Sequence, residues 1–121
     1  MKILVVDDDE EVLNTLKTFF SSEGHEVNTG STAQEGKRLA LVDKPDLMLL
    51  DIRLPDQDGN EILKELKEAD KDLVIVMITG YKDAEKVVSA FRLGAFDCLL
   101  KPFNYDYLRN NILARVPRRV R

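Results

Sequence analysis

The sequence LMLLD at residues 47–51 is an apolar run that ends in a carboxylate. The sequence ILVVDD at residues 3–8 has the same form, because four apolar residues are followed by Asp7 and Asp8. Short runs that are apolar at consecutive positions are typical of parallel strands covered by helices on both faces. If the two strands are neighbours, their carboxyl ends bring three acidic side chains to one edge of the sheet. Ligands bind at that edge in open α/β folds.

Apolar runs alternate with helical patterns five times along the chain. This alternation predicts an α/β fold, in which a five-stranded parallel sheet has five helices packed on its two faces. The run around Val27 has mixed polarity, which places its strand at an edge of the sheet. The predicted strands lie at residues 3–6, around Val27, and at residues 47–50, 73–78 and 98–100.

Capping signals mark several of the expected helix ends. Ser31 with Gln34 three residues later resembles a capping box. Gly24 and Gly94 are typical helix stops, and Asn104 is a candidate N-cap for the last helix.

Size and composition favour a single domain. The chain has 121 residues and is 44% hydrophobic, which suffices for one core. We assign residues 1–116 to this domain and residues 117–121 to a basic tail or the start of a linker. Cys98 is the single cysteine, which excludes an intramolecular disulfide. No signal-peptide pattern or long apolar run is present, so we expect a cytoplasmic protein without a membrane segment.

The net charge of -4 argues against direct nucleic-acid binding by this domain. Four arginines nevertheless cluster between residues 115 and 121. We interpret them as cations that favour a helix C-terminus, followed by a solvated tail. A nucleic-acid patch is the less favoured interpretation.

The expected acidic cluster has a chemical consequence. Three carboxylates within a few ångströms repel one another unless a positive charge lies among them. Mg²⁺ suits such a site, because it prefers oxygen ligands and leaves positions for water and phosphate oxygens. The alternative is that Asp7, Asp8 and Asp9 form a solvated acidic turn that caps the first helix.

Two further polar residues end apolar runs. Lys101 follows the fifth run, and its ammonium group can pair with a carboxylate or a phosphoryl oxygen. Thr79 ends the fourth run and is followed by Gly80, where a backbone can approach a ligand closely. Thr79 taken alone is more readily interpreted as a turn or capping residue, and only its combination with the other groups favours a functional role.

These residues resemble the site of response-regulator receiver domains of two-component signalling, and the resemblance extends over residues 1–116. The matching stretches are VVDDD at 5–9, DIRLP at 51–55 with DG at 58–59, TG at 79–80 and KPF at 101–103. The stretch GAFD at 94–97 and the KPF stretch are most similar to receivers of the nitrogen-regulatory type, which precede ATPase modules that activate transcription.

The resemblance implies a flavodoxin-like, doubly wound sheet with strand order 2-1-3-4-5. It implies that Asp51 is the phosphoacceptor. Asp8, Asp51 and the backbone carbonyl of Arg53 would then bind Mg²⁺, and Asp7 would act through a bound water.

The same resemblance assigns roles to two other groups. Lys101 would pair with the phosphoryl group on Asp51, and Thr79 would donate a hydrogen bond to it after transfer. The Lys101–Pro102 peptide bond is expected to be cis.

The resemblance also implies partners. The phosphoryl donor would be a histidine kinase or a phosphotransfer protein, and the domain would act as a switch rather than as an enzyme with an external substrate. An output domain could follow Arg121, and the fourth helix, fifth strand and fifth helix could form a homodimer.

Two other functions compete with a phosphorylated switch. A degenerate receiver would bind partners without phosphorylation. An aspartate-based phosphatase of the haloacid type requires a second acid two residues after the nucleophile, where this chain has Arg53.

The sequence departs from the family at Cys98, where receivers usually carry Tyr or Phe. A thiol is too small to act as the aromatic switch, so Cys98 is expected to be a small buried strand residue. We expect activation to depend on Thr79 and the loop after it. Arg53 and Tyr81 flank the site, and shielding by the Tyr81 ring predicts slow hydrolysis of the phosphoryl group.

Overall fold

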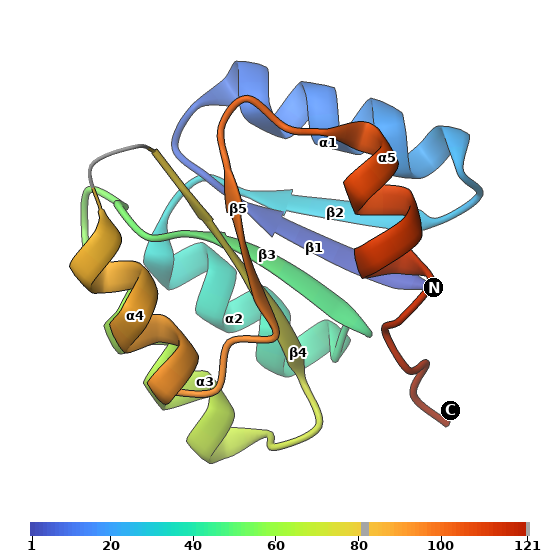
Figure 1. The fold of residues 1–121 in the computed structure, drawn as a ribbon. Helices are drawn as coiled ribbons and strands as arrows, with labels where there is room; N and C mark the ends of the chain where they lie inside the picture. Colours follow the sequence, from blue (N-terminus) through green and yellow to red (C-terminus); the bar gives the residue numbers. More distant parts are fainter. Residues whose placement is uncertain (81–82, 121) are drawn as a thin grey trace.

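The computed structural model describes residues 1–80 and 83–120, and it contains one parallel sheet between two layers of helices (Figure 1). The strand order is β2-β1-β3-β4-β5, and every pair of neighbours is parallel. The predicted flavodoxin-like topology is therefore confirmed, with β2 at an edge. The strands are β1 (Lys2–Val6), β2 (Glu26–Gly30), β3 (Leu47–Asp51), β4 (Val74–Thr79) and β5 (Asp97–Leu100).

The helices divide between the two faces of the sheet. In Figure 1, α1 and α5 cover one face, while α2, α3 and α4 cover the other. The last helix begins as α5 and continues as the π-helical segment η1. The helices are α1 (Glu10–Ser22), α2 (Ala33–Asp43), α3 (Gly59–Ala69), α4 (Ala84–Arg92), α5 (Tyr105–Tyr107) and η1 (Leu108–Leu113).

The apolar strands supply both cores, because successive side chains of a strand point to opposite faces. Met48 and Leu50 pack toward α2, α3 and α4, whereas Leu47 and Leu49 pack toward α1 and the last helix. All four are fully buried. This explains why the third strand lacks the alternation of a half-exposed strand.

Most of the predicted helix ends are confirmed. Gly24 and Gly94 have φ of +88° and +104°, a backbone conformation that side chains with a Cβ rarely adopt. Asn104 caps α5, and its side chain accepts a hydrogen bond from the Tyr107 N–H at 3.0 Å.

The predicted capping box of α2 is wrong by one residue. Thr32, rather than Ser31, is the N-cap, and its hydroxyl accepts the Glu35 N–H at 3.1 Å. The Gln34 N–H instead donates to Asp56 of the β3–α3 loop at 3.1 Å. Thr32 and Glu35 have the same spacing as Ser31 and Gln34, so the observed cap was present in the local sequence one residue further on.

The basic tail differs from the solvated segment that we expected. The Arg119 N–H donates to Asp46 at 2.7 Å, and the Arg119 guanidinium donates to the Pro45 carbonyl at 2.9 Å. The same guanidinium pairs with Asp70 at 2.5 Å. These contacts tie residue 119 to the amino-terminal edge of the sheet.

None of the helices in residues 1–80 and 83–120 is both long enough and apolar enough to cross a bilayer.

Candidate functional site

Five polar side chains lie at the carboxyl edge of the sheet. Asp51 and Thr79 are the last residues of β3 and β4, Asp7 and Asp8 follow β1, and Lys101 follows β5. Strands β1 and β3 are adjacent, with Val6 opposite Leu50. The parallel sheet therefore brings together side chains that are far apart in the sequence.

The three carboxylates form one cluster. Asp7, Asp8 and Asp51 each offer a carboxylate oxygen, and these oxygens lie within 4.8 Å of one another. Asp7 and Asp51 are buried, whereas Asp8 is exposed. The cluster thus has a buried base and one side open to solvent.

The alternative interpretation of Asp7, Asp8 and Asp9 was a turn that caps the first helix, and only Asp9 has that role. Asp9 is the N-cap of α1 and accepts the Glu11 N–H at 2.9 Å. Asp7 accepts the N–H of Asp9 at 3.0 Å. The turn therefore caps the helix through Asp9 and leaves Asp7 and Asp8 in the acidic cluster.

Asp51 is held in an environment that disfavours its charge. Burial, with the nearby charge of Asp7, raises the pKa of Asp51 to about 7. The Arg53 N–H opposes this shift, because it donates to Asp51 Oδ1 at 3.0 Å. A carboxylate in this position gains strongly from a bound cation.

Lys101 supplies part of that positive charge. Its Nζ lies 2.8 Å from Asp7 Oδ2 and 3.7 Å from Asp51 Oδ2. Burial acts to lower the pKa of Lys101, but the bond to Asp7 and the charge of Asp51 raise it above its ordinary value. Lys101 therefore stays protonated at neutral pH.

The donor set fits a hard divalent cation. Among the described residues, Lys101 is the only cationic side chain within ion-pair distance of the three carboxylates. Part of their negative charge therefore remains uncompensated. Oxygen ligands of this kind suit Mg²⁺ better than a transition metal, which favours nitrogen or sulfur.

Gly59 explains how the chain folds beneath this cluster. A Cβ at Gly59 would lie 2.6 Å from the Ile52 Cα and closer still to the Asp51 carbonyl oxygen. The Gly59 N–H donates to the Ile52 carbonyl at 2.7 Å. The pair Asp58-Gly59 in the sequence thus allows α3 to begin directly against the end of β3.

Thr79 is buried at the edge of the site, and its hydroxyl is hydrogen-bonded to groups outside the cluster of Asp7, Asp8 and Asp51. Its hydroxyl lies 3.0 Å from both Asp83 Oδ2 and the Gly80 carbonyl. Asp83 Oδ1 in turn accepts the Arg53 Nε at 2.8 Å. This bond to Arg53 and the bond from Thr79 lower the pKa of Asp83, although burial opposes them.

Asp83 was not identified from the sequence. It lies directly before the apolar pattern of α4, where an aspartate is common as a helix N-cap and carries no specific signal of a functional role. Arg53 was identified for its backbone carbonyl, whereas its side chain forms the pair with Asp83.

Cys98 lies in β5 and is half-buried, packed against the core beneath α4. Burial, with the nearby Asp97, raises the pKa of its thiol to about 11. The thiolate is therefore scarce at neutral pH, which agrees with a packing role. Tyr81, the expected shield of the phosphoryl group, lies outside the described residues.

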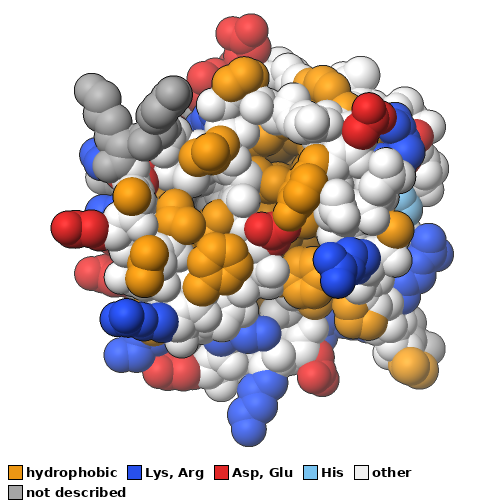
Figure 2. All heavy atoms as spheres, in the orientation of Figure 1, with side chains coloured by type: hydrophobic (Ala, Val, Ile, Leu, Met, Phe, Trp, Pro, Cys, Tyr) orange, Lys and Arg blue, Asp and Glu red, His pale blue; other side chains and the backbone are white. Residues whose placement is uncertain are grey.

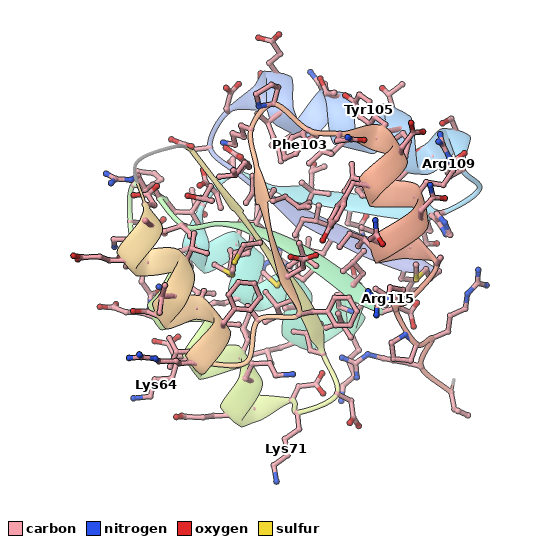
Figure 3. All side chains as sticks on the ribbon, in the orientation of Figure 1. Lys64, Lys71, Phe103, Tyr105, Arg109 and Arg115 are labelled. Carbon is pink, nitrogen blue, oxygen red and sulfur yellow. The ribbon has the colours of Figure 1, made fainter. Side chains whose placement is uncertain are left out.

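The Lys101–Pro102 peptide bond is cis, as expected. The chain that follows it runs toward α1, and Figure 3 shows Phe103 on this connection and Tyr105 at the start of α5, both near that helix. Tyr105 packs on Phe19 of α1, with ring centroids 4.9 Å apart.

Comparisons with known proteins place the chain in one family. Residues 3–113 match the family described as response regulator receiver domain. The chain is 36% identical over 107 residues to Regulatory protein AtoC of Escherichia coli K12, covering 88% of this chain and 23% of that protein. It is 31% identical over 116 residues to Sporulation initiation phosphotransferase F of Bacillus subtilis 168, covering 96% and 94%.

A solved structure gives the same result. The crystal structure of the receiver domain of NtrX from Brucella abortus superposes with a TM-score of 0.84 at 38% identity, covering 88% of this chain and 91% of that one. The expected likeness to nitrogen-regulatory receivers is confirmed by these matches. The chain spans about a quarter of the length of AtoC.

Proposed function

Because this chain belongs to the response-regulator receiver family, we propose that it accepts a phosphoryl group on Asp51 from a phosphohistidine of a kinase or phosphotransfer protein. A carboxylate oxygen of Asp51 attacks the phosphorus, and the bond from phosphorus to the histidine nitrogen breaks. The products are an acyl phosphate on Asp51 and a free imidazole on the donor.

The observation that carries this proposal is the buried Asp51 carboxylate at the centre of the acidic cluster, with the Lys101 ammonium beside it. The Arg53 N–H fixes one carboxylate oxygen of Asp51. The other oxygen faces Lys101, which balances charge on the incoming phosphoryl oxygens.

Asp8, Asp51 and the Arg53 backbone carbonyl would hold Mg²⁺, with Asp7 acting through a water. The ion would neutralise negative charge on the transferring phosphoryl oxygens. Asp7 also anchors the Lys101 ammonium at 2.8 Å, so that the lysine stays beside Asp51. Thr79 would donate its hydroxyl hydrogen to the phosphoryl group after transfer.

Incubation with Mg²⁺ and acetyl phosphate, followed by intact mass measurement, tests the assignment. We expect one phosphate adduct on the wild-type chain and none on Asp51→Asn, which keeps the shape of the side chain. An adduct at this position in Asp51→Asn would contradict the assignment. Absence of an adduct on the wild type would indicate a degenerate receiver, and turnover of varied phosphate esters would indicate a phosphatase.

The receiver would transmit its state through α4, β5 and the last helix. Large hydrophobic side chains are exposed on this face, including Val88, Phe91 and Leu100 (Figure 2). This surface fits a homodimer or an output domain that follows the receiver in a longer protein.

A further inference from the structure

The hydroxyl of Thr79 is committed to a partner other than Asp51. Thr79 and Asp83 are both buried, and Thr79 Oγ1 lies 3.0 Å from Asp83 Oδ2. A hydroxyl carries one hydrogen, and Asp83 Oδ2 and the Gly80 carbonyl, each 3.0 Å from Thr79 Oγ1, compete for it. The charged carboxylate is the stronger acceptor, so Thr79 must leave Asp83 before it can donate to a phosphoryl group on Asp51.

The second oxygen of Asp83 is also occupied. Arg53 Nε and Nη2 lie 2.8 Å and 2.5 Å from Asp83 Oδ1. The backbone N–H of the same arginine donates to Asp51. Asp83 thus connects the residue beside the phosphoacceptor to the threonine expected to sense it.

Asp83 occupies the N-cap position of α4 without capping that helix. Across the described residues, no backbone N–H of the first turn of α4 donates to its side chain. By contrast, Asp9, Thr32, Asp58 and Asn104 accept such bonds at the starts of α1, α2, α3 and α5. The first turn of α4 is held to α3 by other contacts: Lys86 pairs with Asp58, and Asn60 Nδ2 donates to the Lys86 carbonyl at 2.9 Å.

We propose that Asp83 is a positioning residue that latches Thr79 and Arg53 in the resting protein and caps α4 when the latch opens. This inference rests on phosphorylation of Asp51. A phosphoryl group there adds negative charge and acceptor oxygens beside Arg53 and Thr79, so it competes for both partners of Asp83. The released carboxylate is already at the N-cap residue, where it can accept a backbone N–H of the first turn.

This exchange transmits the signal without an aromatic residue at position 98. Thr79 moves toward the phosphoryl group, Asp83 turns toward α4, and the start of that helix gains a cap. Both movements begin from contacts present in the resting structure. The closed latch must be opened at a cost in free energy, so it weakens the binding of any phosphoryl mimic.

Titration with beryllofluoride and Mg²⁺ tests the latch. Asp83→Asn removes the charge that holds Arg53 and Thr79 but keeps a side chain that caps helices well. We expect this variant to bind beryllofluoride about threefold to tenfold more tightly than the wild type. Asp83→Ala also opens the latch but cannot cap α4, so it should gain less than Asp83→Asn.

The control is Asp72→Asn, which removes a charge from an exposed residue in the loop before β4. We expect it to bind beryllofluoride as the wild type does. Wild-type affinity in Asp83→Asn would overturn the latch. Equal or tighter binding by Asp83→Ala than by Asp83→Asn would overturn the capping step.

A second measurement needs no phosphoryl transfer, because the variants are observed in the resting state and beryllofluoride serves only to mark the active positions, and so it separates the latch from the proposed function. Amide resonances of Thr79 and of α4 are compared in the resting wild type, Asp83→Asn and Arg53→Ala, with Arg92→Ala as an exposed control on α4. Both latch variants should shift these resonances in the same direction, toward the positions of the beryllofluoride-bound wild type. Unmoved resonances in both variants refute the latch, whereas absence of an acetyl phosphate adduct refutes phosphorylation of Asp51.

Discussion

At the scale of single residues, the site combines groups whose burial is unfavourable unless a ligand is present. Asp51 illustrates this, because burial and Asp7 raise its pKa from 3.8 to about 7. Between these two values the folded state binds more protons than the unfolded state does. The stability of the cation-free protein should therefore fall as the pH rises from about 4 to 7.

Replacing Asp51 should remove this cost. We expect Asp51→Asn to raise the free energy of unfolding by about 1–3 kcal/mol at pH 7 in Mg²⁺-free buffer, because no charge is then buried. Denaturant unfolding at pH 5 and pH 7 measures the effect, which should be smaller at pH 5. Adding Mg²⁺ should stabilise the wild type and not the variant. A variant no more stable than the wild type at pH 7 would show that burial of the Asp51 charge does not destabilise the protein.

At the scale of elements, the junction between β3 and α3 allows the site to form. Gly59 lies so close to the end of β3 that a Cβ would overlap the backbone of Ile52. A methyl group there can be accommodated only if the start of α3 moves away from Asp51.

Gly59→Ala should therefore destabilise the protein by about 2 kcal/mol or more and slow phosphorylation by acetyl phosphate. Gly80→Ala is the matched control for stability, because a Cβ at Gly80 meets no atom of residues 1–80 and 83–120 within 4 Å. Denaturant unfolding of both variants measures the difference. Similar losses in the two would mean that the β3–α3 junction tolerates the added methyl group.

At the scale of the whole molecule, residues 117–120 follow a path set by contacts at the sheet edge opposite the site. The hydrogen bond from Arg119 lowers the pKa of Asp70, although burial acts to raise it. An acid whose pKa is lowered by folding contributes stability above its unfolded pKa and loses it as the pH falls.

Arg119→Ala should lower the free energy of unfolding at pH 7 by about 1 kcal/mol, because the pair is only partly buried. The difference from the wild type should narrow as the pH falls below about 3.8. Arg118→Ala is the control, since Arg118 is exposed. Phosphorylation by acetyl phosphate should be unchanged in both variants, because residue 119 lies at the other edge of the sheet. A loss of stability that does not depend on pH would argue against the ion pair.

The sequence by itself determined the sheet, its two helical layers and the five polar groups at its carboxyl edge. These follow from periodicity and from the position of each group at a strand end, such as Asp51 after residues 47–50. The bonds from the first turn of α2 to Asp56 and the docking of Arg119 on Asp46 and Asp70 could not be predicted, because these acids come from segments distant in sequence. The partner of Thr79 likewise required the fold, since Asp83 and Arg53 come together only in the folded chain. Local pattern fixes which residues end a strand, whereas the choice among hydrogen-bond partners depends on tertiary distances.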